Sequence, residues 1–324
     1  MNIQTVLGPV PVNRLGKTLM HEHVFVSFPG AEFDPRYTFD RTAFVELAVS
    51  RLKELVALGV STFVDPCPIE LGRDVRLLAE VSERSGMHIV CATGFYFEAM
   101  GIPPYWRHAS VEEIADLYVR EIEQGIDGTN IRAGLLKCST GAPQISELER
   151  RCLTAASIAQ RRTGVPILTH TEAGQCGPDQ QDLFESQGVP LNRCLIGHSC
   201  GNPDHAYHLG IAKRGSFVGF DRIGNVRRQS DDVRVDNVVK LIEAGHAERV
   251  MLSQDRYCGW RGKFFYETSE EGTRAIDAAR ATGAWPPSYT YLFDTFIPML
   301  RARGVPQTTI DAILTDNPRR FFTT

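Results

Sequence analysis

Two histidines near the start of the chain, His21 and His23, have the spacing of a metal-binding pair. They follow an apolar segment, Thr18–Met20, that we expect to be a strand. Because residues two apart in a strand point to the same face, both imidazoles project together while Glu22 points away. Two neutral imidazoles on one face supply half of the donors of a transition-metal site. The alternative is a pair of polar histidines at a strand end that bind no ion.

Four further residues with metal-binding side chains stand at the ends of apolar, strand-like runs. Lys137, His170 and His198 each close such a run, and Asp255 closes the last one. In a closed α/β barrel the carboxyl ends of the strands converge at one mouth, where active sites lie. Each residue has an ordinary explanation when taken alone: a lysine can extend to solvent, a histidine can form a hydrogen bond, and an aspartate can cap the next segment. Six such residues at the same end of one barrel instead indicate a metal centre.

The donor types define the metal chemistry. Imidazole nitrogen and carboxylate oxygen suit Zn²⁺, and also Co²⁺, Fe²⁺ or Mn²⁺. Four histidines and one aspartate are many donors for one catalytic ion with an open position, but they suit two ions that share a hydroxide. Burial lowers the pKa of a lysine, so part of Lys137 is expected to be neutral amine, which adds CO₂ to give a bidentate carbamate. The residues therefore predict two divalent ions bridged by the carbamate of Lys137.

The elements that must position these side chains alternate along the chain. Short β-rich runs are predicted at Thr18–Met20, Thr62–Val64, His88–Thr93, Ala133–Lys137, Pro166–His170, Cys194–His198, Ser216–Phe220 and Arg249–Ser253. Helix-like stretches lie between them, for example at Arg41–Leu58, Asp74–Ser85, Val111–Gln124, Glu147–Thr163, Asp204–Lys213 and Val233–Ala244. This alternation predicts a parallel sheet, and eight runs are the strand count of a (β/α)8 TIM barrel. An open, doubly wound sheet is the alternative, although no GxGxxG motif follows the first strand.

Two segments lie outside this repeat. Residues 3–12, with Gly8-Pro9 in the middle, predict a short N-terminal hairpin. Residues 256–287 predict a long irregular loop after the eighth strand, rich in Gly, Arg, Tyr and Trp. Such loops are usually functional in compact domains, although the sequence does not show what this one does. No linker or low-complexity tract divides the chain, so we expect a single domain over residues 1–324.

The composition of the 324 residues excludes several classes of function. The formal net charge is −4 and no basic run stands out, which argues against a nucleic-acid partner. We find no apolar stretch long enough to span a bilayer and no signal-peptide pattern at the N-terminus. The eight cysteines contain no CxxC pair, and several lie in apolar runs. We therefore expect a cytoplasmic protein with reduced cysteines, a small-molecule substrate and no membrane partner.

The ordered set of motifs resembles the phosphotriesterase-like family of the amidohydrolase superfamily. The matching motifs are His21-x-His23, Leu71-Gly72-Arg73-Asp74, Gly134-x-x-Lys137, Thr169-His170-Thr171, Ile196-Gly197-His198, Ser253-x-Asp255 and Asp316-Asn317-Pro318-Arg319. The resemblance implies a binuclear hydrolase in which one ion is held by His21, His23 and Asp255 and the other by His170 and His198. Carboxylated Lys137 and a hydroxide would bridge the ions. The resemblance also implies a homodimer.

Two further positions resemble the lactonase branch of that family. Tyr96, in Phe95-Tyr96-Phe97, matches a tyrosine that points at the bridging hydroxide, and Asp221-Arg222 matches as well. The resemblance therefore implies a lactonase that opens lactone rings by attack of this hydroxide, and it is compatible with promiscuous phosphotriesterase activity. The alternatives are an organophosphate phosphotriesterase, an amide-type hydrolase on the same centre, and a non-catalytic metal-binding protein. The sequence does not choose the lactone or the native metal.

Three residues are predicted to be catalytic: Asp255, Tyr96 and Arg222. Asp255 would accept the proton of the hydroxide and pass it to the leaving oxygen. Tyr96 would position the substrate or hold the hydroxide, unless it is an aromatic that packs at the barrel rim. Arg222 would orient the remote part of the substrate. Predicted substrate-binding residues are Tyr96, Arg222, Arg256, Tyr257 and Trp260. The arginines could recognise an anionic group, or they could be solvated charges at the rim.

Overall fold

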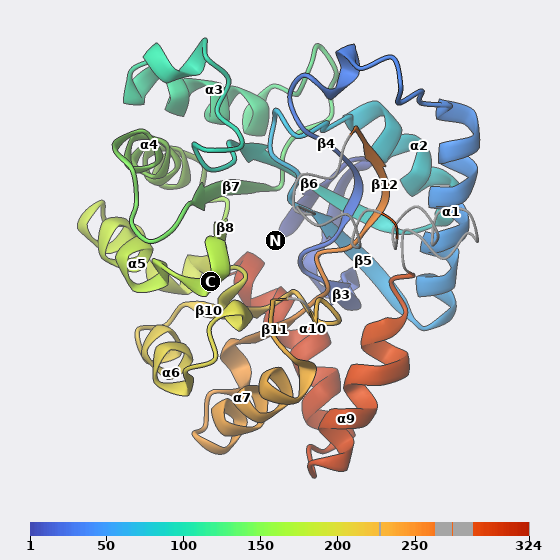
Figure 1. The fold of residues 1–324 in the computed structure, drawn as a ribbon, viewed down its shortest axis with the longest axis vertical. Helices are drawn as coiled ribbons and strands as arrows, with labels where there is room; N and C mark the ends of the chain where they lie inside the picture. The colour runs from blue at the N-terminus through green and yellow to red at the C-terminus, as the bar shows by residue number, and fades with distance from the viewer. Residues whose placement is uncertain (227, 263–273, 275–287, 324) are drawn as a thin grey trace.

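A parallel eight-stranded sheet curves into a barrel in the computed structural model, which describes residues 1–226, 228–262, 274 and 288–323 (Figure 1). Its strands are β3 (Lys17–Leu19), β5 (Val60–Asp65), β6 (His88–Gly94), β7 (Leu135–Thr140), β8 (Ile167–Thr171), β9 (Cys194–Ile196), β10 (Phe217–Phe220) and β11 (Val250–Leu252). Each strand pairs with the next one in this order. Every predicted β-rich run overlaps one of these strands, and the (β/α)8 architecture is confirmed.

Helices surround the barrel (Figure 1). They are α1 (Arg41–Ala57), α2 (Val75–Ser85), α3 (Val111–Glu123), α4 (Glu147–Thr163), α5 (Gly177–Ser186), α6 (His205–Lys213), α7 (Asp231–Glu243), α9 (Ile297–Ala302, preceded by the π-helical turn Leu292–Phe296) and α10 (Gln307–Thr323). Ser110 and Ser146 begin α3 and α4 with capping boxes, and Gly164 ends α4 in the left-handed conformation. All six predicted helical stretches overlap a helix.

The interior of the barrel is filled by apolar side chains that alternate along the strands. Leu135 of β7 and Leu168 of β8 belong to this interior cluster. Because side chains two residues apart share a face, Lys137 and His170 also point into the barrel, one layer nearer its mouth. The apolar layer below them thus fixes the direction in which two of the predicted ligands project.

Glu22, between the two histidines of the first motif, joins the first and last strands of the barrel. One carboxylate oxygen accepts hydrogen bonds from Ser253 Oγ at 2.9 Å and from the backbone N–H of Gln254 at 2.8 Å. The other accepts from the backbone N–H of Arg256 at 2.9 Å. The backbone N–H of Asp255 also donates to the carbonyl of His21 at 3.0 Å. These hydrogen bonds fix the position of His21 and His23, the first predicted ligands in the chain, relative to Asp255, the last one.

Two details differ from the sequence expectation. The N-terminal hairpin is present as β1 (Asn2–Thr5) and β2 (Gly8–Pro11), but its turn falls at residues 6–7. The turn residues Gly8-Pro9 instead begin the second strand. After β11 the expectation of an irregular loop is wrong for β12 (Tyr257–Arg261), which pairs in parallel with β4 (His23–Ser27). Residues 263–273 and 275–287 of that predicted loop lie outside the described residues.

The remaining class expectations concern membranes and cysteines. None of the helices in the described part of the chain has the length and apolar character needed to cross a membrane. All eight cysteines are buried as free thiols. Their burial agrees with the expectation that they are small core residues rather than a disulfide framework.

A buried ion pair links the loop after β5 to α3. Arg73 donates to both oxygens of Glu121, at 2.6 and 2.8 Å, and to the carbonyl of Ala92 at 3.0 Å. We expect Glu121→Gln to destabilise the fold by about 3–5 kcal/mol, because it leaves a buried guanidinium uncompensated. Thermal and urea unfolding would measure this effect. The double variant Arg73→Met/Glu121→Leu should recover most of the loss, and an equally unstable double variant would contradict this explanation.

Candidate metal centre

The six predicted ligands come together at the carboxyl ends of the barrel strands. One oxygen of Asp255 lies 3.7 Å from Nε2 of His21 and 3.2 Å from Nε2 of His23. Its other oxygen lies 3.6 Å from Nε2 of His198. Nζ of Lys137 lies 3.1 Å from Nε2 of His21. Three imidazoles, a carboxylate and an amine therefore converge on one small volume.

His170 completes the group from β8. The centroid of its ring lies 4.6 Å from that of His198, and the two rings are nearly perpendicular at 87°. The side chains of His170, His198 and Lys137 are almost fully buried. The ligands predicted for the two ions are thus neighbours in space, although the first and the last of them, His21 and Asp255, are 234 positions apart in the chain.

Two of the ligands have an uncommon backbone conformation. His198 and Asp255 lie in the left-handed region, with φ values of 56° and 55°. Non-glycine residues adopt this region rarely and at a cost, and such residues cluster at functional sites. Asp255 lies beyond the end of β11 and His198 beyond the end of β9. In both cases the positive φ falls in the segment that follows the strand, and the side chain faces the ligand group.

Burial sets the protonation of these groups. Burial lowers the pKa of His21 and of His170 to about 4, and it also lowers the pKa of His198. These imidazoles are therefore neutral at physiological pH, which is the form that binds metals. Burial likewise lowers the pKa of Lys137 to about 8. More of this amine is then neutral at pH 7 than for an exposed lysine, and carbamate formation requires the neutral amine.

The neighbours of Asp255 oppose the effect of burial. Burial alone would raise its pKa, but His198, His23 and Arg222 hold that pKa well below the ordinary value. For His23 burial alone would lower the pKa, yet hydrogen bonds with Asp255 and Asp65 raise it. A metal ion at this histidine would therefore displace a proton.

Carboxylates stand behind three of the four histidines. Asp221 binds Nδ1 of His21 at 2.8 Å and Nδ1 of His198 at 3.0 Å. Asp65 lies 3.2 Å from Nδ1 of His23. Such partners fix the tautomer and orientation of metal-binding imidazoles, here with Nε2 facing inward. Sequence reasoning used Asp221 only for the family resemblance and missed Asp65. Asp65 ends β5, so the strand-end rule that found the ligands would also have found it.

The residues present fit divalent transition metals. Neutral imidazole nitrogens and an ionised carboxylate are the donors that Zn²⁺ and related ions prefer. The ligand atoms of His21, His23 and Asp255 all lie within 4.8 Å of one another. In His21, His23 and His198 a carboxylate binds Nδ1, the ring nitrogen that points away from the other ligands, as in known metal sites. The donor set, its protonation and its supporting hydrogen bonds are thus consistent with one another.

Tyr96 and Arg222 lie against the ligand group. The ring of Tyr96 meets that of His170 edge-on, with centroids 4.8 Å apart. Nε of Arg222 lies 3.0 Å from Oδ2 of Asp255, and the Arg222 side chain is 9 % exposed. Arg222 is therefore an ion-pair partner at the centre rather than a solvated charge at the rim.

The predicted substrate-binding residues on β12 and directly before it fall into two groups. Trp260 packs edge-on against Phe28 at 5.1 Å, and Tyr257 lies 5.4 Å from Trp260. Trp260 belongs with Tyr96 to one apolar cluster, which therefore continues from β12 to His170. Arg256 differs from them because its guanidinium donates to the carbonyl of Ser288 at 2.7 Å and lies 5.0 Å over the Tyr291 ring. The guanidinium therefore contacts Ser288 and Tyr291, while the backbone carbonyl of Arg256 accepts a hydrogen bond from the N–H of His23 at 2.7 Å.

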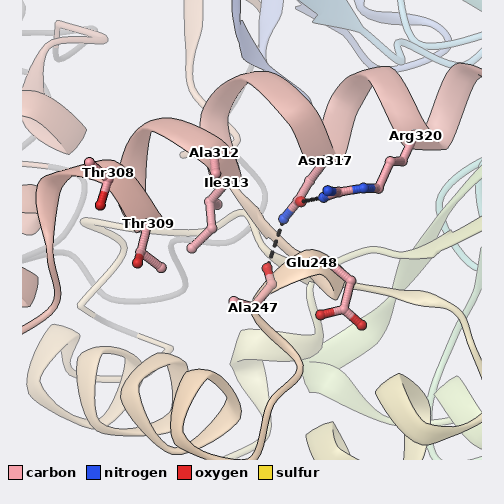
Figure 2. A pocket seen from close by; sticks show the side chains of 8 residues that line it. All are labelled: Ala247, Glu248, Thr308, Thr309, Ala312, Ile313, Asn317 and Arg320. Atoms are coloured by element: carbon pink, nitrogen blue, oxygen red, sulfur yellow. Dashed lines mark hydrogen bonds between the residues drawn. The ribbon is translucent and has the colours of Figure 1, made fainter.

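A groove of about 320 Å³ lies beside Ala247 and Glu248, at the end of the barrel where β11 begins. The residues that line it are shown in Figure 2. Figure 2 shows Asn317 of α10 pointing across it to the carbonyl of Ala247, a bond of 2.8 Å. Asn317 also donates to the carbonyl of Val250 at 2.8 Å and accepts from Arg320. This residue of the last sequence motif therefore attaches α10 to the start of β11. Because barrel active sites lie at the opposite mouth, we give this groove no catalytic role.

Comparison with known proteins agrees with this arrangement. The chain matches the phosphotriesterase family over residues 1–322. It is 38% identical over 330 residues to a phosphotriesterase homology protein of Mycobacterium tuberculosis, covering 99% of this chain and 97% of that one. It is 30% identical over 334 residues to a phospho-furanose lactonase of Mycoplasmopsis synoviae, covering 98% and 90%.

The fold matches as well as the sequence. An organophosphorus hydrolase from Deinococcus radiodurans superimposes with a TM-score of 0.90 and 37% identity, covering 99% of this chain and 97% of that one. The superposition covers nearly the whole of both chains. The chain therefore belongs to the phosphotriesterase family, and it is a hydrolytic enzyme of that metal-dependent family.

Proposed function

We propose that the protein is a lactonase, which hydrolyses cyclic esters at a centre of two divalent metal ions. The observation that carries the proposal is the placement of Tyr96 against His170, with ring centroids 4.8 Å apart. Arg222 lies 3.0 Å from Asp255. The two residues that resemble the lactonase branch, Tyr96 and Arg222, therefore both contact the ligand group. The similarity to a phospho-furanose lactonase supports the same substrate class.

The metal assignment follows the resemblance. His21, His23 and Asp255 would hold one ion, and His170 and His198 would hold the other. Lys137, as its carbamate, would serve as the shared ligand, and Zn²⁺ is the proposed metal. When bound, two such ions polarise the carbonyl of a substrate and lower the pKa of water. The burial of Lys137 supports the carbamate, because burial lowers the pKa of its amine to about 8.

The protein side chains then direct the reaction. Asp255 has a low pKa, so its carboxylate is ionised and accepts the proton of the attacking water on Oδ1 or Oδ2. It returns this proton to the ring oxygen that leaves. Tyr96 directs its ring toward the reacting group and positions the ester. Arg222 holds Asp255 through Nε, and its other N–H groups are donors that we assign to orienting the remote part of the substrate.

The assembly and the location are also part of the proposal. We propose a single-domain homodimer in the cytoplasm, on the basis of the family resemblance. The eight buried free thiols support a reducing compartment, because secreted proteins usually pair their cysteines.

A substrate panel tests the lactonase assignment. Zn²⁺- and Co²⁺-loaded protein would be assayed for kcat/KM with γ-, δ- and aromatic lactones, acyl-homoserine lactones and a phosphotriester. We expect a lactone to rank first, because Tyr96 and Arg222 contact the ligand group as the lactonase resemblance requires. Metal-free protein is the control. A ranking led by the phosphotriester would favour the second candidate, an organophosphate hydrolase like the similar protein of Deinococcus radiodurans.

A further inference from the structure

His170 is held differently from the other histidines of the centre. Its Nε2 lies 3.2 Å from Oε2 of Glu172, two residues further along the chain. The other three ligand histidines contact a supporting carboxylate through Nδ1. Glu172 therefore gives the fourth imidazole the carboxylate partner that Asp65 and Asp221 give the others. No sequence motif singled out this residue.

Glu172 is itself fixed by the loop that follows β10. Its Oε1 lies 3.0 Å from Nη2 of Arg228, while its Oε2 faces His170. The side chain of Glu172 is 19 % exposed and that of Arg228 is 36 % exposed. The same loop begins with Asp221 and Arg222, which contact the ligand group directly. The carboxylate of Glu172 thus joins the β8 ligand to the loop after β10.

The ring of His170 has little freedom apart from this contact. It stacks on Phe97 at 5.3 Å with an angle of 19° between the rings, and Tyr96 meets it edge-on. The carbonyl of His170 accepts a hydrogen bond from Gln180 at 2.9 Å. The stacking fixes the plane of the ring, and the bond with Glu172 selects which nitrogen carries the proton.

We propose that Glu172 is a positioning residue of the metal centre, and that Arg228 holds it so that the loop after β10 adjusts metal binding at His170. The inference rests on the proposed centre of two ions. Metal binding makes the remaining N–H of an imidazole a stronger donor, so the bond with a carboxylate gains strength when the ion is present. Loss of such a partner typically costs about 10- to 100-fold in metal affinity.

The direct test is metal titration of three variants against the wild type. Stepwise Zn²⁺ affinity would be measured with a chromophoric chelator, and Co²⁺ absorption spectra would report the ligand geometry. We expect Glu172→Ala to weaken one of the two binding steps about 10- to 100-fold and to alter the Co²⁺ spectrum. Glu172→Gln, which keeps an oxygen that can accept from Nε2–H, should lose less. Arg228→Ala should fall between Glu172→Ala and the wild type.

A matched control separates this effect from general loss of an ion pair. Glu185 on α5 pairs with Arg214 at 3.1 Å and its side chain is 66 % exposed, so Glu185→Gln should leave both binding steps unchanged. In Zn²⁺-loaded protein labelled with ¹⁵N-histidine, His170 should carry its proton on Nε2 in the wild type. Circular dichroism would show that each variant is folded. If Glu172→Ala fails to fold, Glu172→Gln and Arg228→Ala carry the test.

Each contrary result has a distinct meaning. A wild type that binds fewer than two ions would contradict the proposed centre itself. Wild-type affinity for both ions in Glu172→Ala, with a raised KM for lactones, would make Glu172 a substrate contact and overturn the inference alone. Equal weakening in the Gln and Ala variants would assign the effect to charge and not to the hydrogen bond, which would also overturn it.

Discussion

Asp255→Asn is expected to lower kcat by about 10²- to 10⁴-fold, the usual contribution of a positioned acid or base. In the proposed reaction Asp255 takes a proton from water and returns it to the leaving oxygen. An amide cannot perform this transfer, although its oxygen can still face the same imidazoles. The low pKa of Asp255, held down by His198, His23 and Arg222, keeps the carboxylate ionised, and an amide cannot reproduce that charge.

The measurement combines lactone turnover with metal content. Metal per chain in Asp255→Asn should stay above half of the wild-type value, because the four histidines and Lys137 remain. Asp182→Asn is the matched control, since this aspartate on α5 is 71 % exposed and pairs only with Arg214 among the described residues. Wild-type kcat in Asp255→Asn with both ions bound would remove Asp255 from the proton transfer.

Lys137→Ala is expected to reduce activity by at least about a hundredfold. Loss of a residue that only supports a metal ligand typically costs about 10- to 100-fold, and Lys137 is itself a proposed ligand. The residue is 1 % exposed and lies 3.1 Å from His21, so alanine leaves a gap inside the ligand group. The proposed bridge also needs CO₂. Metal-free wild-type protein loaded with Zn²⁺ in CO₂-free buffer should therefore regain little activity until bicarbonate is added.

Two alanine variants show whether the response to bicarbonate depends on Lys137. Lys137→Ala should show no response to bicarbonate, whereas the exposed Lys213→Ala on α6 should respond as the wild type does. Mass spectrometry under mild conditions should detect the added CO₂ only when Lys137 is present. Two bound ions and full activity in Lys137→Ala would exclude the carbamate bridge.

The fold was predictable because its periodicities are local. Short β-rich runs marked all eight barrel strands, and the longer stretches between them marked helices such as α4 between β7 and β8. The exceptions have tertiary causes. β12 forms because it pairs with β4, more than 200 residues earlier in the chain, and no local signal records that pairing.

The candidate ligands were predictable from one rule, that polar residues at strand ends meet at the barrel mouth. The rule could not show which acidic residues support them. Glu172 resembles any loop acid until His170 and Arg228 are placed beside it. For Arg256 the sequence indicated a role that its side-chain contacts do not reflect. Its position after Asp255 indicated a substrate contact, yet its side chain turns to Ser288 and Tyr291, whose positions depend on the packing of the C-terminal helices.

The bonds of Glu22 have a consequence for the biosynthesis of the protein. They join the first barrel strand to Ser253, Gln254 and Arg256 across a separation of more than 230 residues. On the ribosome, His21 and His23 emerge early, but the carboxylate of Asp255 reaches them only when the last strand has left the exit tunnel. Contacts of such long range form late in folding. In the proposed metal centre, loading of the ions would therefore follow translation, and we expect a nascent chain stalled before β11 to lose the ion.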